Sequence, residues 1–163
     1  MNALHGVLDY SFPTFALRVK YDQQQLIKAE FCALEDVLAV NELDDGSELR
    51  VRIIQQLDAY RVHPQFIFDL PLLLAGTEHQ EKIWQIMRQI PAGQSLTYGE
   101  VAHQASSAPR AVGGACGKNP FPVIIPCHRI IAANNKLGGF NSGNIFFNLG
   151  IKKWLLAHEG ILL

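Results

Sequence analysis

The stretch TYGEVAHQASSAPRAVGGACG, residues 97–117, contains two short helical patterns on either side of a tight turn. Thr97 is a suitable N-cap for a helix over Tyr98–Ala105, because its hydroxyl can accept a hydrogen bond from the first turn. The SSAP segment predicts a turn, and Pro109 fits the first turn of a further helix over Arg110–Cys116. The pattern therefore predicts a helix-turn-helix, and the small residues of its second helix allow close approach to another backbone or to a nucleic acid strand.

Further helical patterns stand before and after this segment. Glu78–Ile90 has apolar residues at helical spacing, and Thr77 is its candidate N-cap. Leu149–Glu159 is predicted to be an amphipathic helix, with Gly160 as the C′ glycine that ends it. The polar, glycine-rich residues 132–144 that precede it are predicted to be a loop.

The N-terminal half reads as a separate unit. Phe15–Lys20 and Leu26–Ala33 flank YDQQQ and predict a β-hairpin, and Arg50–Tyr60 carries an apolar stripe typical of a helix. Two prolines and a glycine in HPQFIFDLPLLLAGT place a boundary near residues 71–77. We therefore expect one domain over residues 1–75 and another over residues 76–163.

Composition excludes several classes of protein. The 163 residues are 48% hydrophobic and 18% charged, which is ordinary for a globular protein. No run approaches the length of a membrane span, and the N-terminus lacks the pattern of a signal peptide. Three cysteines without close spacing do not form a disulfide framework, so a reducing, cytoplasmic location is expected.

The two halves of the chain carry opposite net charge. Residues 1–75 contain 6 Lys and Arg against 11 Asp and Glu, whereas residues 76–163 contain 8 against 4. A basic second half is suited to a polyanionic partner.

The segment VIIPCHRIIA, residues 123–132, places a cysteine beside a histidine between two apolar runs that resemble strands. A thiolate is the reactive form of cysteine, and a neighbouring base can generate it. Adjacent residues on a regular strand point to opposite faces, so Cys127 and His128 can cooperate only if the strand breaks there. Pro126 supplies a reason for a break, which would leave the cysteine on a turn, firmly held but reachable.

Other interpretations of this cysteine remain open at this point. Cys127 could be a small buried hydrophobic residue, as free cysteines often are. A zinc site would need four ligands at characteristic spacing, and the chain has neither a Cys-x-x-Cys pair nor a paired histidine motif. A cysteine protease is a further alternative, although no protease signature surrounds Cys127.

The C-terminal half resembles the O6-alkylguanine-DNA alkyltransferases, which move the alkyl group of a damaged guanine onto their own cysteine. The resemblance rests on three segments, TYGEVA, RAVGGACGKNPFPVIIPCHRII and KKWLLAHEG. It covers residues 77–161. It implies an α/β (α+β) fold: a small N-terminal αβ, ribonuclease H-like scaffold domain, then a mostly helical, winged-helix-like domain with a helix-turn-helix and an active-site cysteine loop.

The resemblance also implies roles for individual residues. Cys127 would attack the alkyl carbon, His128 would take the thiol proton through a water, and Glu159 would orient His128. Tyr98 would donate to the departing guanine oxygen, and Asn119 would brace the turn around the cysteine.

A second implied set of residues contacts the substrate DNA. Arg110 would fill the space that the flipped base leaves in duplex DNA, and Lys118 would contact phosphate. The full DNA-binding set is Arg110, Ala111, Gly114, Lys118 and Arg129. The implied alkyl and guanine pocket is formed by Pro122, Ile130, Phe140, Asn141 and Ser142. The implied protein is a monomer that acts on double-stranded DNA carrying O6-alkylguanine, with O4-alkylthymine as an open second substrate, and it needs no membrane, metal or cofactor.

One segment departs from the family pattern. NIFFNLG, residues 144–150, adds about five residues before the last helix. Ile145, Phe146 and Phe147 would form an apolar loop tip beside the pocket, which either packs against the last helix or acts as a lid. Asn141 stands where a serine is common, which could alter the hydrogen bonding to guanine.

Functions other than repair fit the sequence less well. A non-catalytic binder of alkylated DNA usually has tryptophan at the cysteine position, and an alkylation-sensing regulator would need further cysteines, so both are disfavoured. A cysteine hydrolase would turn over many times, whereas an alkylated cysteine stops after one reaction.

Overall fold

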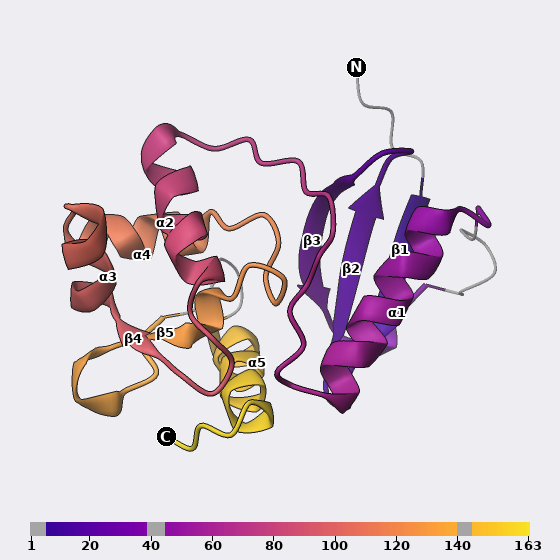
Figure 1. The fold of residues 1–163 in the computed structure, drawn as a ribbon. Helices are drawn as coiled ribbons and strands as arrows, with labels where there is room; N and C mark the ends of the chain where they lie inside the picture. Colours follow the sequence, from indigo (N-terminus) through magenta and orange to yellow (C-terminus); the bar gives the residue numbers. More distant parts are fainter. Residues whose placement is uncertain (1–5, 39–44, 140–144) are drawn as a thin grey trace. The chain divides into compact units, whose positions relative to one another are not determined.

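The computed structural model describes residues 6–38, 45–139 and 145–163 of a mixed α/β protein (Figure 1). The chain divides into two compact units, residues 1–74 and residues 75–163. None of the helices within the described ranges combines the length and the apolar character that crossing a bilayer requires.

The first unit contains an antiparallel sheet with the order β1-β2-β3. The predicted hairpin is confirmed as β2 (Ala16–Tyr21) and β3 (Leu26–Cys32), whereas β1 (Gly6–Ser11) was not predicted. Buried and partly exposed residues alternate along β1, as they do in a strand with one face on a core. A 3-10 turn, η1 (Leu34–Asp36), follows the sheet.

The predicted helix of the first unit is α1 (Glu48–Val62), which packs on this sheet (Figure 1). It begins two residues earlier than predicted, because the Ser47 hydroxyl accepts a hydrogen bond from the Arg50 amide and caps it. Ile53, Leu57 and Tyr60 are fully buried at helical spacing and form the face that meets the sheet.

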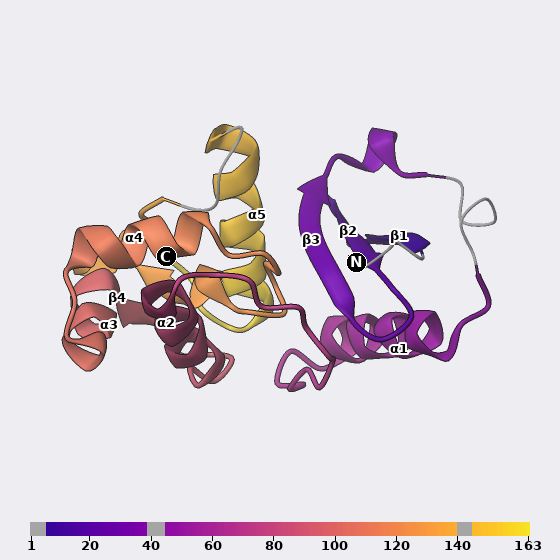
Figure 2. The same ribbon diagram turned by 90° about the horizontal axis from the view of Figure 1, so that it is seen from above.

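The second unit is built on α2 (Glu78–Arg88), α3 (Tyr98–Ala105) and α4 (Pro109–Gly117), which pack on one another (Figure 2). All three were predicted within two residues at either end. Thr77 and Gln80 form a capping box at the start of α2, and the Thr97 hydroxyl accepts a hydrogen bond from the Glu100 amide at the start of α3. Local capping therefore fixes both helix starts.

The predicted turn between α3 and α4 is present. Ser106 adopts left-handed backbone angles, with φ of 52°, and ends α3. Pro109 then occupies the first turn of α4, where its missing amide hydrogen costs nothing. Trp84 connects α2 to α4, because its buried indole donates a hydrogen bond to the carbonyl oxygen of Ala115 at 3.0 Å.

Two very short strands connect the helices to the cysteine segment. β4 (Leu96–Thr97) pairs in parallel with β5 (Ile130–Ile131). The strand β5 follows directly on η3 (Cys127–Arg129), a 3-10 turn, and precedes a second such turn, η4 (Ala133–Asn135). This pairing brings the start of α3 next to the cysteine turn.

The last helix, α5 (Ile145–His158), begins four residues earlier than predicted. The expectation of an apolar loop tip is therefore wrong for the described residues of the insert, which are helical. The cause is a buried stripe that continues back into the insert at spacings of three and four residues. Its members are Asn148, Ile151, Lys152, Leu155, Leu156 and Glu159.

The end of α5 follows the predicted pattern. Gly160 adopts a φ of +92°, its amide donates to the Ala157 carbonyl, and the Ile161 amide donates to the Leu156 carbonyl. These bonds form a Schellman motif, which fixes the position of Glu159 at the helix end.

Replacing Gly160 by alanine tests this helix end. We expect Gly160→Ala to lower the free energy of unfolding by about 1–2 kcal/mol, because alanine disfavours left-handed backbone angles. Gly150, which is exposed inside α5, is the matched control. Gly150→Ala should instead raise stability by about 0.5–1 kcal/mol, because alanine favours a helix interior. Urea unfolding of both variants measures this, and equal shifts would contradict the assignment.

Candidate active site

The cysteine lies on a turn, but the run before it is not a strand. Pro126 has φ of −81° and ψ of 68°, and the Cys127 amide donates to the Ile125 carbonyl at 2.8 Å, as in an inverse γ-turn. Val123 has a φ of 76°, which is unusual for a β-branched residue and prevents an extended run. The predicted break at Pro126 is therefore present, while the predicted preceding strand is wrong.

Asn119 connects the two ends of this turn. Its amide nitrogen donates to the Ile125 carbonyl at 2.8 Å, and its amide oxygen accepts from the Phe121 backbone at 2.9 Å. Asn119 is 6% exposed, so both bonds replace lost hydration. Against the larger effect of burial, Asn119 also lowers the pKa of the Cys127 thiol. These bonds tie Asn119 to both ends of the turn, and its role in the reaction stays a prediction.

His128 and Glu159 form a buried pair although 31 residues separate them. The distance from His128 Nε2 to Glu159 Oε2 is 2.7 Å. Burial opposes ionisation of Glu159, but the nearby His128 and Arg129 hold the pKa of its carboxyl well below its usual range. A carboxylate only accepts hydrogen bonds, so Nε2 carries the proton and Nδ1 is the acceptor. Nδ1 is buried and has no hydrogen-bond partner within the described part of the chain.

The structure removes Arg129 from the expected DNA-binding residues. Its guanidinium donates to Glu159 Oε1 at 2.8 Å, to Glu159 Oε2 at 3.0 Å and to the Ile90 carbonyl at 2.6 Å. Only 9% of the residue is exposed. The fork geometry of arginine suits a bidentate carboxylate, so this side chain fixes Glu159 and is directed away from solvent.

Replacing Arg129 separates this structural role from DNA binding. We expect Arg129→Met to lower the free energy of unfolding by about 3–5 kcal/mol, because it leaves the Glu159 carboxylate with fewer partners in a buried site. Arg88→Met, at an exposed arginine of α2, is the control and should change stability by less than about 0.5 kcal/mol. Chemical denaturation measures both, and a stability loss no larger than the control's would contradict the structural role.

The thiol and the imidazole are both neutral in this environment. Cys127 is 2% exposed, so it is less reachable than expected. Burial raises the pKa of its thiol to about 11, although Asn119, Lys152 and backbone amides favour the thiolate. Burial lowers the pKa of His128, against the opposing effect of Glu159. A neutral imidazole beside a protonated thiol is the arrangement that general-base activation requires.

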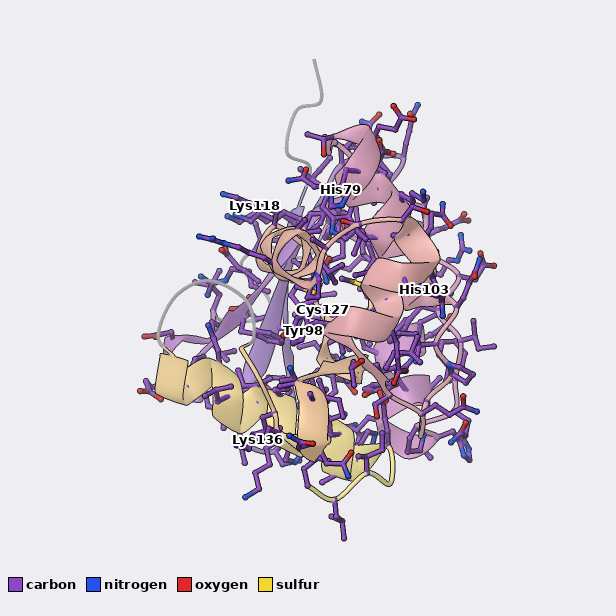
Figure 3. All side chains as sticks on the ribbon, turned by 90° about the vertical axis from the view of Figure 1, so that its left-hand side faces the viewer. His79, Tyr98, His103, Lys118, Cys127 and Lys136 are labelled. Atoms are coloured by element: carbon purple, nitrogen blue, oxygen red, sulfur yellow. The ribbon has the colours of Figure 1, made fainter. Side chains whose placement is uncertain are left out.

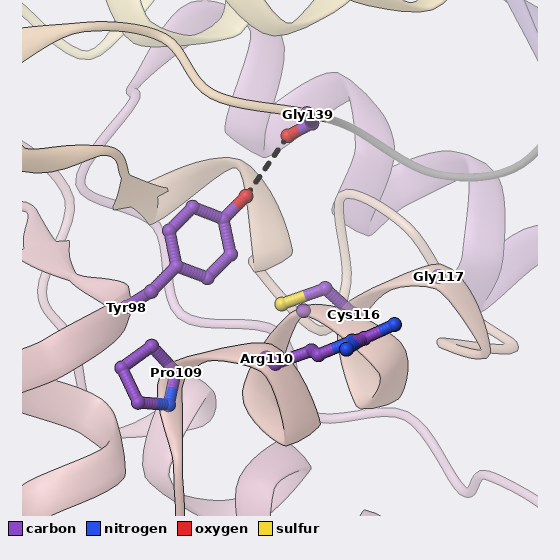
Figure 4. Close-up of a pocket in the computed structure, with 7 residues that line it drawn as sticks. Tyr98, Pro109, Arg110, Cys116, Gly117 and Gly139 are labelled. Atoms are coloured by element: carbon purple, nitrogen blue, oxygen red, sulfur yellow. Dashed lines mark hydrogen bonds between the residues drawn. The ribbon is translucent and has the colours of Figure 1, made fainter.

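A pocket of about 540 Å³ opens between the start of α3, one face of α4 and Gly139 (Figure 4). The ring of Tyr98 and the thiol of Cys116 face it from different walls (Figure 4). Figure 3 places Tyr98 beside Cys127, and the charge of the Cys127 thiolate contributes to the raised pKa of Tyr98, after the larger effect of burial. The residues that line the pocket are Tyr98, Pro109, Arg110, Gly113, Cys116, Gly117 and Gly139.

One buried cation near this pocket was missed in the sequence. Lys152 is fully buried, and its ammonium donates to the carbonyl oxygens of Ile130 and Gly139 at 2.7 and 2.9 Å. The sequence could have predicted this burial. Lys152 lies seven residues before Glu159, and therefore on the same helix face, and one position after Ile151 on the apolar stripe of α5.

The expected DNA-binding residues of α4 share one exposed surface. Arg110, Gly114 and Lys118 are exposed at spacings of four residues, and Ala111 is exposed beside Arg110. Lys118 extends from the end of α4 (Figure 3). Small residues between two cations leave the helix backbone accessible, as close contact with a nucleic acid strand requires.

The expected pocket residues are only partly described. Pro122 and Ile130 are buried near the cysteine turn, and the Ile130 carbonyl already binds Lys152. Phe140, Asn141 and Ser142 lie outside the described residues. Within the described ranges no three His, Cys, Asp or Glu side chains gather as metal ligands would.

Comparison with known proteins gives consistent matches. Residues 78–161 match the family model described as "6-O-methylguanine DNA methyltransferase, DNA binding domain". The methylated-DNA--protein-cysteine methyltransferase of Methanosarcina mazei is 40% identical over 121 residues, 73% of each chain. Its counterpart in Methanosarcina acetivorans is 44% identical over 108 residues, 65% of this chain and 66% of that protein. The crystal structure of Mycobacterium tuberculosis OGT in complex with DNA is 31% identical, with a TM-score of 0.76 over 94% of this chain and 92% of that one.

Proposed function

The chain belongs to the 6-O-methylguanine DNA methyltransferase family, and from this premise we propose that it repairs DNA by moving an alkyl group from O6-alkylguanine onto Cys127. The observation that carries the proposal is the buried hydrogen bond between His128, the neighbour of Cys127, and Glu159. Arg129 holds the carboxylate of Glu159 in place. Each protein molecule reacts once, because the product is a thioether.

The first step is loss of the thiol proton. The neutral imidazole of His128 takes the proton of Cys127 at Nδ1 through a water, while Nε2–H stays bound to Glu159. The ionised Glu159 then stabilises the imidazolium. Because the pKa of Cys127 is raised to about 11, thiolate is scarce until this transfer occurs beside the bound substrate.

The second step is substitution at carbon. The thiolate attacks the alkyl carbon, a bond forms between sulfur and carbon, and the bond between carbon and guanine O6 breaks with its electrons left on O6. Tyr98 donates a hydrogen bond to this oxygen as negative charge develops. In balance, the alkyl group replaces the thiol hydrogen, and guanine gains one hydrogen. No step in this scheme requires a metal or cofactor.

The exposed face of α4 would bind the DNA. Lys118 would contact phosphate, while Arg110, on the rim of the pocket, would enter the base stack when the target nucleotide flips out. Ala111 and Gly114 would let α4 lie close to the sugar-phosphate walls of the minor groove. Phe140, Asn141 and Ser142 complete the proposed alkyl and guanine pocket with Pro122 and Ile130.

The two units would have different roles. Residues 76–163 would form a winged-helix-like domain for DNA binding and transfer, and residues 1–75 a ribonuclease H-like scaffold. The antiparallel sheet with α1 on it supports the latter assignment. The cytoplasmic location and the monomeric state remain part of the proposal, and the free thiols of Cys32, Cys116 and Cys127 fit a reducing compartment.

Intact-protein mass spectrometry tests the function. The protein is incubated with a duplex that carries one O6-methylguanine, and with the same duplex carrying guanine. We expect the mass to increase by one methyl group less the displaced thiol hydrogen, once per protein molecule, only with the lesion duplex. Unchanged mass with selective binding of the lesion duplex would instead support a non-catalytic lesion binder, and repeated turnover would support a hydrolase.

A further inference from the structure

Cys116 is a second buried thiol at the proposed active site, and the alkyl transfer to Cys127 does not use it. It comes from α4, is 6% exposed and lines the pocket, where its sulfur faces the ring of Tyr98 (Figure 4). Cys32, the remaining cysteine, lies in the first unit. The wall of the pocket therefore carries a nucleophile that the proposed reaction leaves without a role.

Hydrogen bonds through Asn119 connect Cys116 with the cysteine turn. The Asn119 backbone amide donates to the Cys116 carbonyl at 3.2 Å, and its side chain donates to the Ile125 carbonyl at 2.8 Å. The same Ile125 carbonyl accepts from the Cys127 amide at 2.8 Å. The charges of both thiolates also contribute to the raised pKa of Tyr98, after the larger effect of burial. The end of α4 and the cysteine turn therefore hold two thiols around one side chain.

Two thiols held in this way suit an alkyl group with two reactive ends. A group with a leaving group on its far carbon is still an electrophile after its near carbon has moved from guanine O6 to Cys127. Burial and the charge of a Cys127 thiolate both raise the pKa of Cys116, whereas the ammonium of Lys152 lowers it. The thioether formed at Cys127 is neutral and removes the second of these effects. Alkylation of Cys127 therefore makes Cys116 a better nucleophile than it was before.

We propose that Cys116 is a second alkyl acceptor, which captures the free end of a bifunctional alkyl group after the first end has bound Cys127. This inference rests on the proposed function. With chloride as the leaving group, a bond forms between the Cys116 sulfur and the far carbon. The bond from that carbon to chlorine breaks with its electrons on chloride, and the thiol proton passes to solvent. The product is a bis-thioether bridge between α4 and the cysteine turn, whose far carbon can no longer attack the DNA.

The experiment uses a duplex in which O6 of one guanine carries a trans-butenyl chain with chlorine on its far carbon. The wild type is incubated with this duplex and quenched in denaturant with an excess of a small thiol, which caps any open chain. Trypsin cuts after Arg110, Lys118 and Arg129, so the two cysteines fall in separate peptides, 111–118 and 119–129. We expect mass spectrometry to find these peptides joined by the butenyl bridge in about tenfold excess over the capped chain, because a thiol held in place outcompetes water.

Two variants serve as controls. Cys116→Ala should give only the capped open chain, and Cys32→Ala, at a cysteine of the first unit, should form the bridge as the wild type does. Methyl transfer from O6-methylguanine duplex, measured on the same samples, shows whether each variant is folded and active. If Cys116→Ala fails in that assay, Cys116→Ser replaces it, because a hydroxyl has a similar shape and is a far weaker nucleophile.

The outcomes separate this inference from the function on which it rests. A wild type that accepts methyl but gives only the capped chain, or that does not react with the chlorobutenyl duplex, would overturn the role of Cys116. A bridge from Cys127 to any other residue would overturn it as well. No methyl transfer by the wild type would instead reject the proposed function.

Discussion

A Cys127→Ser variant is expected to gain no methyl group from O6-methylguanine duplex under conditions in which the wild type is fully alkylated. A hydroxyl is a far weaker nucleophile than a thiol, and His128 cannot generate an alkoxide as it can a thiolate. Time-resolved intact-mass measurement with excess duplex gives the result directly. Binding of the lesion duplex should persist within about threefold, because the α4 face and the pocket are unchanged.

The control for this prediction is Cys32→Ser in the first unit, which should be alkylated at the wild-type rate. Cys116 is unsuitable as a control because it lines the pocket. Methyl gain by Cys127→Ser would mean that another residue accepts the alkyl group. Peptide mapping would then identify the acceptor.

A Glu159→Gln variant should transfer the methyl group about a thousandfold more slowly, by analogy with loss of the orienting acid in a catalytic triad. The amide no longer fixes the proton on His128 Nε2 or stabilises an imidazolium, so the base loses both orientation and strength. Single-turnover kinetics measure the rate. Glu78→Gln, at an exposed acid of α2, is the control and should react normally.

The same variant should change how stability depends on pH. The pKa of Glu159 is lowered in the folded protein, so its contribution to stability is present above its unfolded value, near 4.3, and is lost as pH falls further. The lowered pKa of His128 acts in the same direction below about 6.5. Below pH ~4 the wild type should lose stability more steeply than Glu159→Gln, and parallel curves would contradict the shift.

Local signals predicted the helices of the second unit well. Thr77 and Thr97 begin helices through hydrogen bonds to residues three positions away, so the information lies in the sequence itself. In contrast, β1 was not predicted, because its pairing with β2 depends on a partner outside the local window. The early start of α5 was missed because the insert reads as a loop until its buried stripe is followed back from Glu159.

Motif and geometry agree for part of the candidate site. His128 meets Glu159, and Asn119 binds the turn that leads to Cys127, while their catalytic roles stay predictions. The burial of Arg129 and Lys152 was not predicted, because long cationic side chains are usually exposed and their burial depends on distant partners. Ile90, Gly139 and Glu159 supply those partners, and no local pattern identifies a carbonyl oxygen as a ligand for a lysine or an arginine.

The order of the active-site groups along the chain matters for a protein that reacts only once. Synthesis proceeds from the N-terminus, so the ribosome makes Cys127 and His128 before Lys152 and Glu159. A nascent chain therefore has its thiol before it has the carboxylate that orients the base and the ammonium that favours the anion. Because burial raises the pKa of the folded Cys127 thiol to about 11, against about 8.5 for a free cysteine, the single reactive thiol is most vulnerable to a stray electrophile before α5 folds against the turn and best protected once the site is complete.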